Sequence, residues 1–260
     1  MAFLGTAYRG WQRQPGVPTV QQVVEETMTK VMKQPCYATG CGRTDAQVHA
    51  SQFFFHTDLE AEPDFDWVKR LNKALPQDLA VYDWIPVAPD QHARYDARQR
   101  TYEYYLHLRK DPFLHAISSL IEADQLNIEK MQRALNLCMQ YTDFRSFCRA
   151  PADYKHTRCH LSEATLQVSQ GGYRMRFRFT ADRFLAKMIR SLVGRILEVA
   201  CGTRSVEEME QLFLYQQPPR VLDAAPPQGL FLSKVTYPYL EVNVQASLVR
   251  AHQEVEWQAV

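Results

Sequence analysis

The residues best suited to chemistry lie in the stretch from Gly42 to Ala50, which reads GRTDAQVHA. A glycine suits a tight turn, and Arg43 and Asp45 follow it two residues apart. The apolar run of residues 53–55 comes soon after and predicts a buried strand. A guanidinium and a carboxylate on a short connection between rigid elements are typical of a functional site. The same residues also fit a capped turn, in which Thr44 and Asp45 bind local backbone N–H groups.

The elements that must position this stretch are short helices and strands in alternation. Thr19 with Gln22, and Ser205 with Glu208, have the spacing of capping boxes, and Asn127 can cap a third helix. We expect helices over residues 20–32, 64–75, 128–138, 184–201 and 205–215, and strands over residues 1–4, 37–41, 79–85, 101–108, 159–169, 173–180 and 230–237. Residues after Pro238 show no strong pattern. Mixed elements with several antiparallel connections predict the α+β class.

Six further segments occur in an order that, with residues 42–50, resembles the TruA family of tRNA pseudouridine synthases. The segments are residues 5–12 (GTAYRGWQ), Asn72, Leu75, Pro76 and Asp78 in an N-x-x-L-P-x-D pattern, residues 92–97 (HARYDA), 100–104 (RTYEY), 184–190 (FLAKMIR) and 224–230 (AAPPQGL). The matches span most of the chain, so their order is far more specific than any single motif.

The resemblance implies a tRNA pseudouridine synthase, an isomerase acting on uridines 38, 39 and 40 of the anticodon stem-loop. It implies two RRM-like lobes whose strands form one continuous antiparallel sheet, with helices packed on one side and the active-site cleft between the lobes. We expect residues 1–108 to form the N-terminal catalytic lobe with Asp45, and residues 109–260 to form the C-terminal lobe with the Arg190 helix. A homodimer is also implied, in which one tRNA can touch both subunits.

Pseudouridine formation breaks an N-glycosidic bond and remakes it at carbon, so we expect no metal and no cofactor. It needs a carboxylate that attacks, or stabilises charge on, the sugar or the base, and by resemblance this is Asp45. A buried aspartate stays ionised only beside a cation. Arg190 is the candidate because an arginine within an apolar helix is costly unless it is paired. The alternative is an arginine at the helix edge that extends to water.

The remaining site residues are assigned by the same resemblance. Tyr102 is expected to pack against the flipped base and to assist proton transfer, with Tyr104 on the same strand face as the fallback; a half-buried structural tyrosine is the alternative. Arg43 is expected to touch RNA or to fill the space left by the base, since a stacked base must first be extruded. His49 and His92 are predicted to be structural.

Contacts to RNA phosphates are expected from arginines outside the pocket. The candidates are Arg9, Arg13, Arg94, Arg98, Arg174, Arg176 and Arg178. The last three alternate with Met175, Phe177 and other apolar residues along one strand, so a solvated sheet face explains them equally well.

Composition limits the possible classes of protein. The 260 residues include 46% hydrophobic and 23% charged residues, which is enough for a proper core. A net charge of +1 argues against a general nucleic-acid coating protein but allows a local basic cleft. The six cysteines show no metal-binding spacing, and no apolar run is long enough to span a membrane. We expect reduced thiols and a cytoplasmic location.

Two residues depart from the family pattern. Gln47 stands where a glycine is expected, and it is strained if its φ is positive. Leu4 stands where an aspartate precedes the Gly-Thr pair, and the first strand is expected to be short. Two other functions fit parts of the sequence: a noncatalytic RNA-binding or RNA-folding module on the same fold, and a glycosidase-like hydrolase, which would need a second carboxylate that the sequence does not supply.

Overall fold

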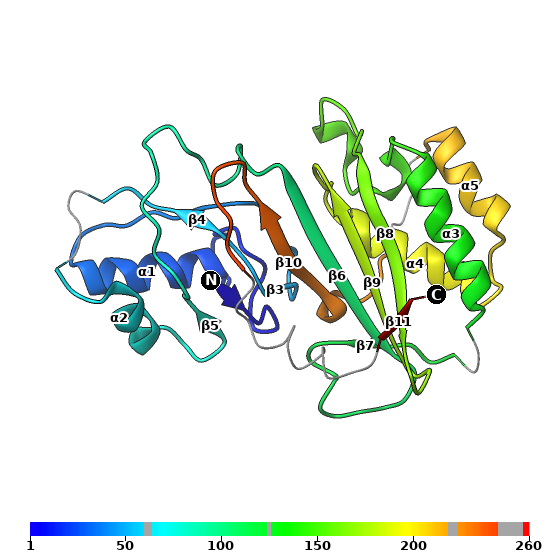
Figure 1. Ribbon diagram of the computed structural model, residues 1–260, viewed down its shortest axis with the longest axis horizontal. Helices are drawn as coiled ribbons and strands as arrows, with labels where there is room; N and C mark the ends of the chain where they lie inside the picture. The colour runs from blue at the N-terminus through cyan, green and yellow to red at the C-terminus, as the bar shows by residue number, and fades with distance from the viewer. Residues whose placement is uncertain (60–63, 124–125, 218–222, 244–256, 260) are drawn as a thin grey trace. The chain divides into compact units, whose positions relative to one another are not determined.

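The computed structural model describes residues 1–59, 64–123, 126–217, 223–243 and 257–259, and the chain divides into two compact units. Unit 1 comprises Met1–Arg98 and Phe231–His252, and unit 2 comprises Gln99–Leu230 and Gln253–Val260 (Figure 1). The described residues form five α-helices, a mixed sheet of nine strands and a separate two-stranded hairpin. The predicted α+β class is therefore confirmed.

Unit 1 contains four short strands of the mixed sheet, in the order β10-β3-β1-β5. They are β10 (Leu230–Thr236), β3 (His49–Ala50), β1 (Ala2–Phe3) and β5 (Leu79–Ala80), and the hairpin is formed by β2 (Thr39–Gly40) and β4 (Phe55–His56). Strand β1 is antiparallel to β3 and β5, but β3 is parallel to β10. The prediction of an entirely antiparallel sheet is wrong at this pairing, and the sheet is mixed.

The strands of unit 1 are shorter than their apolar runs predicted. Of residues 53–55, only Phe55 lies in a strand, although Phe53 is buried in the core against Trp11 at 4.2 Å between ring centroids. Strand β5 ends at Ala80 because the Asn72 side chain then takes both backbone hydrogen bonds of Val81, at 2.6 and 2.8 Å. Buried apolar residues alone do not specify strand hydrogen bonding.

Two of the described helices belong to unit 1 and lie side by side (Figure 1). Helix α1 (Val20–Met32) is capped by Thr19, whose hydroxyl accepts the Gln22 N–H at 3.4 Å. Only this half of the predicted capping box is formed, and the Gln22 side-chain amide donates to Glu26 at 2.9 Å. Helix α2 (Trp67–Ala74) begins later than the predicted Asp64, because the side chain of Asp66 caps it by accepting the Lys69 N–H.

Unit 2 is built on the strand order β11-β8-β9-β6. These strands are β11 (Trp257–Ala259), β8 (Leu161–Ser169), β9 (Arg174–Ala181) and β6 (Gln99–His107), with the short β7 (Ser119–Leu120) parallel to β6. The three long strands match their predictions within two residues. Strand β11 was not predicted, because nothing in its three residues shows that they pair with β8.

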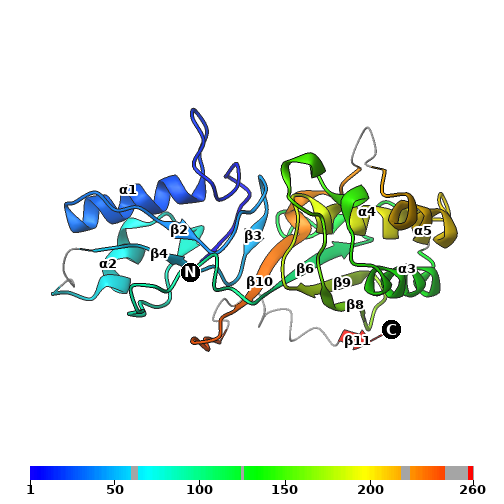
Figure 2. The same ribbon diagram turned by 90° about the horizontal axis from the view of Figure 1, so that it is seen from above.

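Three helices gather on one face of this sheet: α3 (Ile128–Gln140), α4 (Met188–Ala200) and α5 (Val206–Tyr215) (Figure 2). Asn127 caps α3, and Ser205 with Glu208 makes the complete capping box that begins α5, both as predicted. Helix α4 starts at Met188 and not at the predicted Phe184, because Lys187 adopts φ of +61° and cannot continue a helix. No described helix has the length and apolarity needed to cross a membrane.

Candidate active site

Asp45 is a half-buried residue on the connection between β2 and β3 in unit 1. A tight turn follows it, in which the Val48 N–H donates to the Asp45 carbonyl at 3.2 Å. Gln47 occupies this turn with φ of +66°, the left-handed conformation that favours glycine. The suspected strain at the glycine-like position is therefore confirmed. The side chain of Arg43, two residues before Asp45, is exposed.

The opening loop, residues 5–11, holds the Asp45 turn by direct backbone contact. The Trp11 N–H donates to the Thr44 carbonyl at 3.3 Å, and the Gln47 N–H donates to the Tyr8 carbonyl at 3.0 Å. These two bonds flank Asp45 in the sequence. A Cβ added at Gly10, where φ is +91°, would lie 2.3 Å from the Thr44 carbonyl oxygen. The loop can approach this closely only because Gly10 lacks a side chain.

Asp78 of the N-x-x-L-P-x-D segment supports the opening loop through hydrogen bonds. The Tyr8 hydroxyl donates to the Asp78 carboxylate at 2.9 Å, and burial together with this bond raises the pKa of Tyr8. The Leu4 N–H donates to the Asp78 carbonyl at 2.9 Å, while the Leu4 side chain is 40% exposed. Asp78 is therefore a support of the loop at two points. The departure at Leu4 leaves this backbone bonding in place.

Tyr102 and Tyr104 are neighbours on strand β6 in unit 2 with different surroundings. Tyr102 packs edge-to-face on Phe184, with ring centroids 5.1 Å apart, and it is 9% exposed. Tyr104 is fully buried, and its hydroxyl is bonded to Ser119 at 2.8 Å and to the Pro226 carbonyl at 2.9 Å. Burial raises the pKa of Tyr104 despite the opposing influence of Ser119 and of the Arg190 charge. The Tyr104 hydroxyl thus has a structural function.

Arg190 lies in the first turn of α4 and is half-buried. Its Nε donates to the Ala225 carbonyl at 2.7 Å, and the Ala225 N–H donates to the Arg190 carbonyl at 2.9 Å. This double contact joins two segments of the family pattern, residues 184–190 and 224–230. The same double contact holds Arg190 at the start of α4.

Of the four predicted catalytic residues, Arg43 and Asp45 lie in unit 1, and Tyr102 and Arg190 lie in unit 2. The supporting functions of Gly10 and Ala225 were not predicted. Gly10 lies within the motif of residues 5–12, but its close contact with Thr44 depends on how two loops pack. Ala225 contributes only backbone atoms, so its residue type carries no signal of the contact.

The predicted phosphate-binding arginines have unequal surroundings. Arg9, Arg94 and Arg98 are exposed, and Arg94 lies over the Tyr95 ring at 6.0 Å. Arg13 is paired with Glu25 at 3.1 Å. On strand β9 in unit 2, Arg178 lies 3.1 Å from Glu163 and 3.5 Å from Glu103, and Arg176 lies 3.8 Å from Glu103. The paired arginines are weaker candidates for phosphate binding than the exposed ones.

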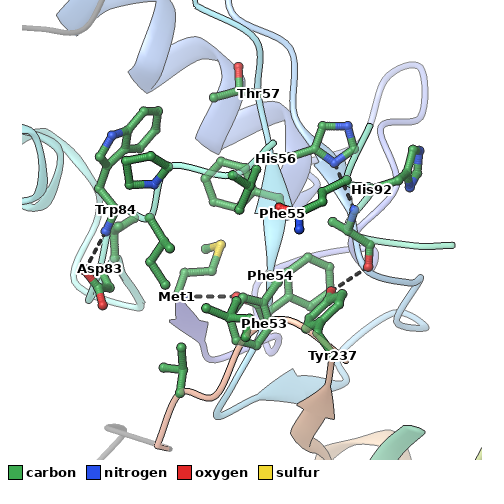
Figure 3. A pocket seen from close by; sticks show the side chains of 18 of the residues that line it. Met1, Phe53, Phe54, Phe55, His56, Thr57, Asp83, Trp84, His92 and Tyr237 are labelled. Carbon is green, nitrogen blue, oxygen red and sulfur yellow. Dashed lines mark hydrogen bonds between the residues drawn. The ribbon is translucent and has the colours of Figure 1, made fainter. Parts of the chain in front are cut away.

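A cavity of about 530 Å³ in unit 1 is lined mainly by aromatic and aliphatic side chains (Figure 3). His56 and His92 lie on one side of it, with ring centroids 4.7 Å apart, and Phe54 packs edge-to-face on Tyr237. None of the four predicted catalytic residues lines this cavity. Within the described residues, no group of three or more His, Cys, Asp or Glu side chains could hold a metal ion.

Comparison with protein families gives the class of this protein. A family model described as tRNA pseudouridine synthase matches residues 1–96 and 141–238. The match includes the opening loop, the Asp45 turn and the start of α4, and the whole of strand β6 lies outside it. The class is thus an RNA-modifying isomerase.

Individual relatives agree over nearly the whole chain. The tRNA pseudouridine synthase A of Porphyromonas gingivalis is 40% identical over 92% of this chain and 95% of its own length. Proteins with the same name from Parabacteroides distasonis and Bacteroides fragilis are 39% and 38% identical, each over 92% of this chain and 94% of their own length. The chain belongs to the tRNA pseudouridine synthase family, as the sequence motifs predicted.

Proposed function

We propose that this chain isomerises uridine to pseudouridine at positions 38, 39 and 40 of the tRNA anticodon stem-loop, with Asp45 as the catalytic carboxylate. The observation that carries the proposal is the Asp45 turn, where backbone bonds from Trp11 and to Tyr8 flank the aspartate. A turn whose backbone is held on both sides keeps its aspartate preorganised for attack on a bound nucleotide. The C1′–N1 bond breaks and C1′ bonds to C5 of the base; the C5 proton passes to water and N1 takes up a proton, so the product is an isomer of the substrate.

Arg190 is proposed as the cation that keeps Asp45 ionised in the catalytic state. A carboxylate in a site closed around a base loses the stabilisation of water, and an adjacent guanidinium replaces it. Support comes from the fixed position of Arg190, whose Nε is held by the Ala225 carbonyl at 2.7 Å. The proposed site forms a cleft between two RRM-like lobes, one carrying Asp45 and the other Arg190.

Tyr102 is proposed to pack against the flipped base and to assist proton transfer. Tyr104 is the weaker choice, because its hydroxyl is already bonded to Ser119 and Pro226 and its ring is fully buried. Arg43 is proposed to occupy the space that the extruded base leaves in the RNA stack, which fits its exposed position next to the turn.

The tRNA backbone is proposed to be bound by the exposed arginines, above all Arg9 and Arg94.

The chain acts as a cytoplasmic homodimer in which one tRNA touches both subunits. Light scattering in solution gives the mass of the assembly, and a mass of one chain at micromolar concentration would contradict the dimer. The proposed chemistry uses no metal or cofactor, so EDTA-treated enzyme is expected to remain active on prefolded tRNA.

The test of the function uses unmodified anticodon stem-loops with tritium at C5 of a single uridine. We expect tritium release from labels at positions 38, 39 and 40, with pseudouridine recovered from the RNA, and no release from a label elsewhere in the loop. Release of free uracil would instead indicate a glycosidase-like hydrolase. Tight binding without any reaction would indicate a noncatalytic RNA-binding module.

A further inference from the structure

We propose that His49 is a positioning residue for the reaction, because its neutral imidazole fixes the opening loop against the Asp45 turn. The proposal rests on the proposed role of Asp45, four residues earlier in the chain. His49 does not act on the substrate itself. It determines where the backbone of two touching segments lies.

The geometry around His49 is closely defined within unit 1. His49 is the first residue of β3, fully buried, and its Nδ1 accepts the Gly5 N–H at 2.9 Å. Its ring stacks on Phe231 of the parallel strand β10, with centroids 4.5 Å apart and planes inclined by 25°. Stacking fixes the plane of the ring, and the hydrogen bond fixes which nitrogen faces the opening loop.

This bond determines the protonation state of the ring. A nitrogen that accepts an N–H carries no proton, so the imidazole is neutral with its proton on Nε2. An imidazolium, or the other neutral tautomer, would direct an N–H of the ring at the N–H of Gly5. Two donors cannot bond, and the buried Gly5 amide would lose its acceptor.

The contact matters for Asp45 because the two segments meet backbone to backbone at this point. A Cβ added at Gly5 would lie only 2.0 Å from the Val48 carbonyl oxygen. Val48 is itself buried and donates its N–H to the Asp45 carbonyl. If Gly5 moves away from His49, Val48 and the catalytic turn are therefore displaced with it. Small displacements of a catalytic group lower the reaction rate strongly.

Two substitutions of His49 test its hydrogen-bond acceptor and its stacked ring separately. His49→Asn places its Oδ1 where Nδ1 stood and keeps the acceptor, whereas His49→Phe keeps the stacked ring and removes the acceptor. We expect His49→Phe to lower kcat about tenfold to a hundredfold with KM for tRNA within about twofold, because displacement of the catalytic turn slows the reaction without weakening tRNA binding. His49→Asn is expected to stay within about threefold of wild type. His107→Phe is the matched control: His107 is also buried and bonded through Nδ1, to Ser118, but it lies in unit 2.

The proposal fails if His49→Phe turns over like wild type, or if His49→Asn loses as much activity as His49→Phe. A measurement on the unaltered protein decides the case in which a variant does not fold. In a spectrum that correlates ring nitrogens with ring protons of 15N-labelled histidine, His49 must show a bare Nδ1 and a protonated Nε2, and a protonated Nδ1 overturns the proposal. This result does not depend on the catalytic role of Asp45, which substitution of Asp45 tests separately.

Discussion

The Asp45 turn of unit 1 and the start of helix α4 in unit 2 hold their charged residues in different ways. Around Asp45 the contacts are between backbones: Trp11 donates to Thr44, and Gln47 donates to Tyr8. At α4 the Arg190 side chain itself is held, through the Ala225 carbonyl. The backbone on either side of Asp45 is thus held by the opening loop, and the Arg190 side chain is held by a carbonyl at a helix end.

The difference predicts which substitutions each region tolerates. A loop held by backbone contacts is insensitive to most side-chain changes on its surface but fails when a Cβ is added where two backbones touch. A side chain held by its own hydrogen bond is instead sensitive to replacement of its functional group. The following substitutions test this contrast.

The largest effect is expected for Asp45→Asn, which keeps the size of the side chain and removes its charge. Turnover should fall more than about a hundredfold while tRNA binding is kept, because the lost interaction belongs to the reaction and not to binding. Asp64→Asn, an exposed aspartate of the same unit, is the control. Turnover of Asp45→Asn within about tenfold of wild type would remove Asp45 from its proposed role.

Arg190→Met is expected to have the next largest effect. Without the guanidinium, the negative charge of Asp45 loses its proposed partner, so turnover should fall while tRNA binding is kept. Arg190→Lys should restore only part of the activity, since an ammonium cannot form the two-pronged contact of a guanidinium. Turnover of Arg190→Met equal to that of wild type would separate Arg190 from Asp45.

Gly10→Ala tests the backbone contact at the Asp45 turn. The added Cβ would meet the Thr44 carbonyl at 2.3 Å, so we expect kcat to fall about tenfold through displacement of the turn. Gly16→Ala is a matched control: Gly16 also has a positive φ, of +73°, but no atom lies within 4 Å of the added Cβ. Equal loss of activity in both variants would show that backbone strain, and not the contact, is responsible.

Substitution of a predicted phosphate-binding arginine is expected to have a smaller effect, which is seen in the affinity for RNA. Binding should weaken steeply with salt despite the net charge of +1, because phosphate contacts release counterions. Arg94→Gln should lower the slope of log affinity against log salt by about 1. Arg13→Gln should leave the slope unchanged, because Arg13 is already paired with Glu25. Equal slopes for both variants and wild type would contradict the assignment of Arg94.

The smallest effect is expected for Gln47→Gly at the strained position of the turn. Glycine adopts a φ of +66° without strain but loses more freedom on folding, so the free energy of unfolding should rise by only about 0.5–1 kcal/mol. Turnover should be unchanged, since the turn keeps its shape. A decrease in stability, measured by denaturant unfolding, would show that the Gln47 side chain makes a contribution of its own.

Local chemistry explains what the sequence predicted correctly. The caps at Thr19, Asn127 and Ser205 depend on residues at most three positions apart, and all three were found. The alternation of arginines with apolar residues predicted strand β9, which pairs with β6 along its whole length. The strain at Gln47 was predicted from the family pattern, in which a glycine stands at this position.

Contacts between distant segments explain what the sequence did not predict. The helical pattern from Phe184 continued through Lys187, whose positive φ stops α4 from starting earlier. The pairing of Arg178 with Glu103 joins strands 75 residues apart and requires the register of β6 and β9. The functional-site motifs identified the family, but the support from Gly10 and Ala225 depends on packing that no single segment encodes.

The most direct test of the account is a crystal structure of the protein bound to an anticodon stem-loop. One distance decides it, that between the Asp45 carboxylate and the Arg190 guanidinium with the target nucleotide in place. The account predicts direct hydrogen bonding at about 2.7–2.9 Å, with the flipped uridine against Asp45 and Tyr102. A separation well beyond hydrogen-bond reach, with no water between the two groups, would contradict it.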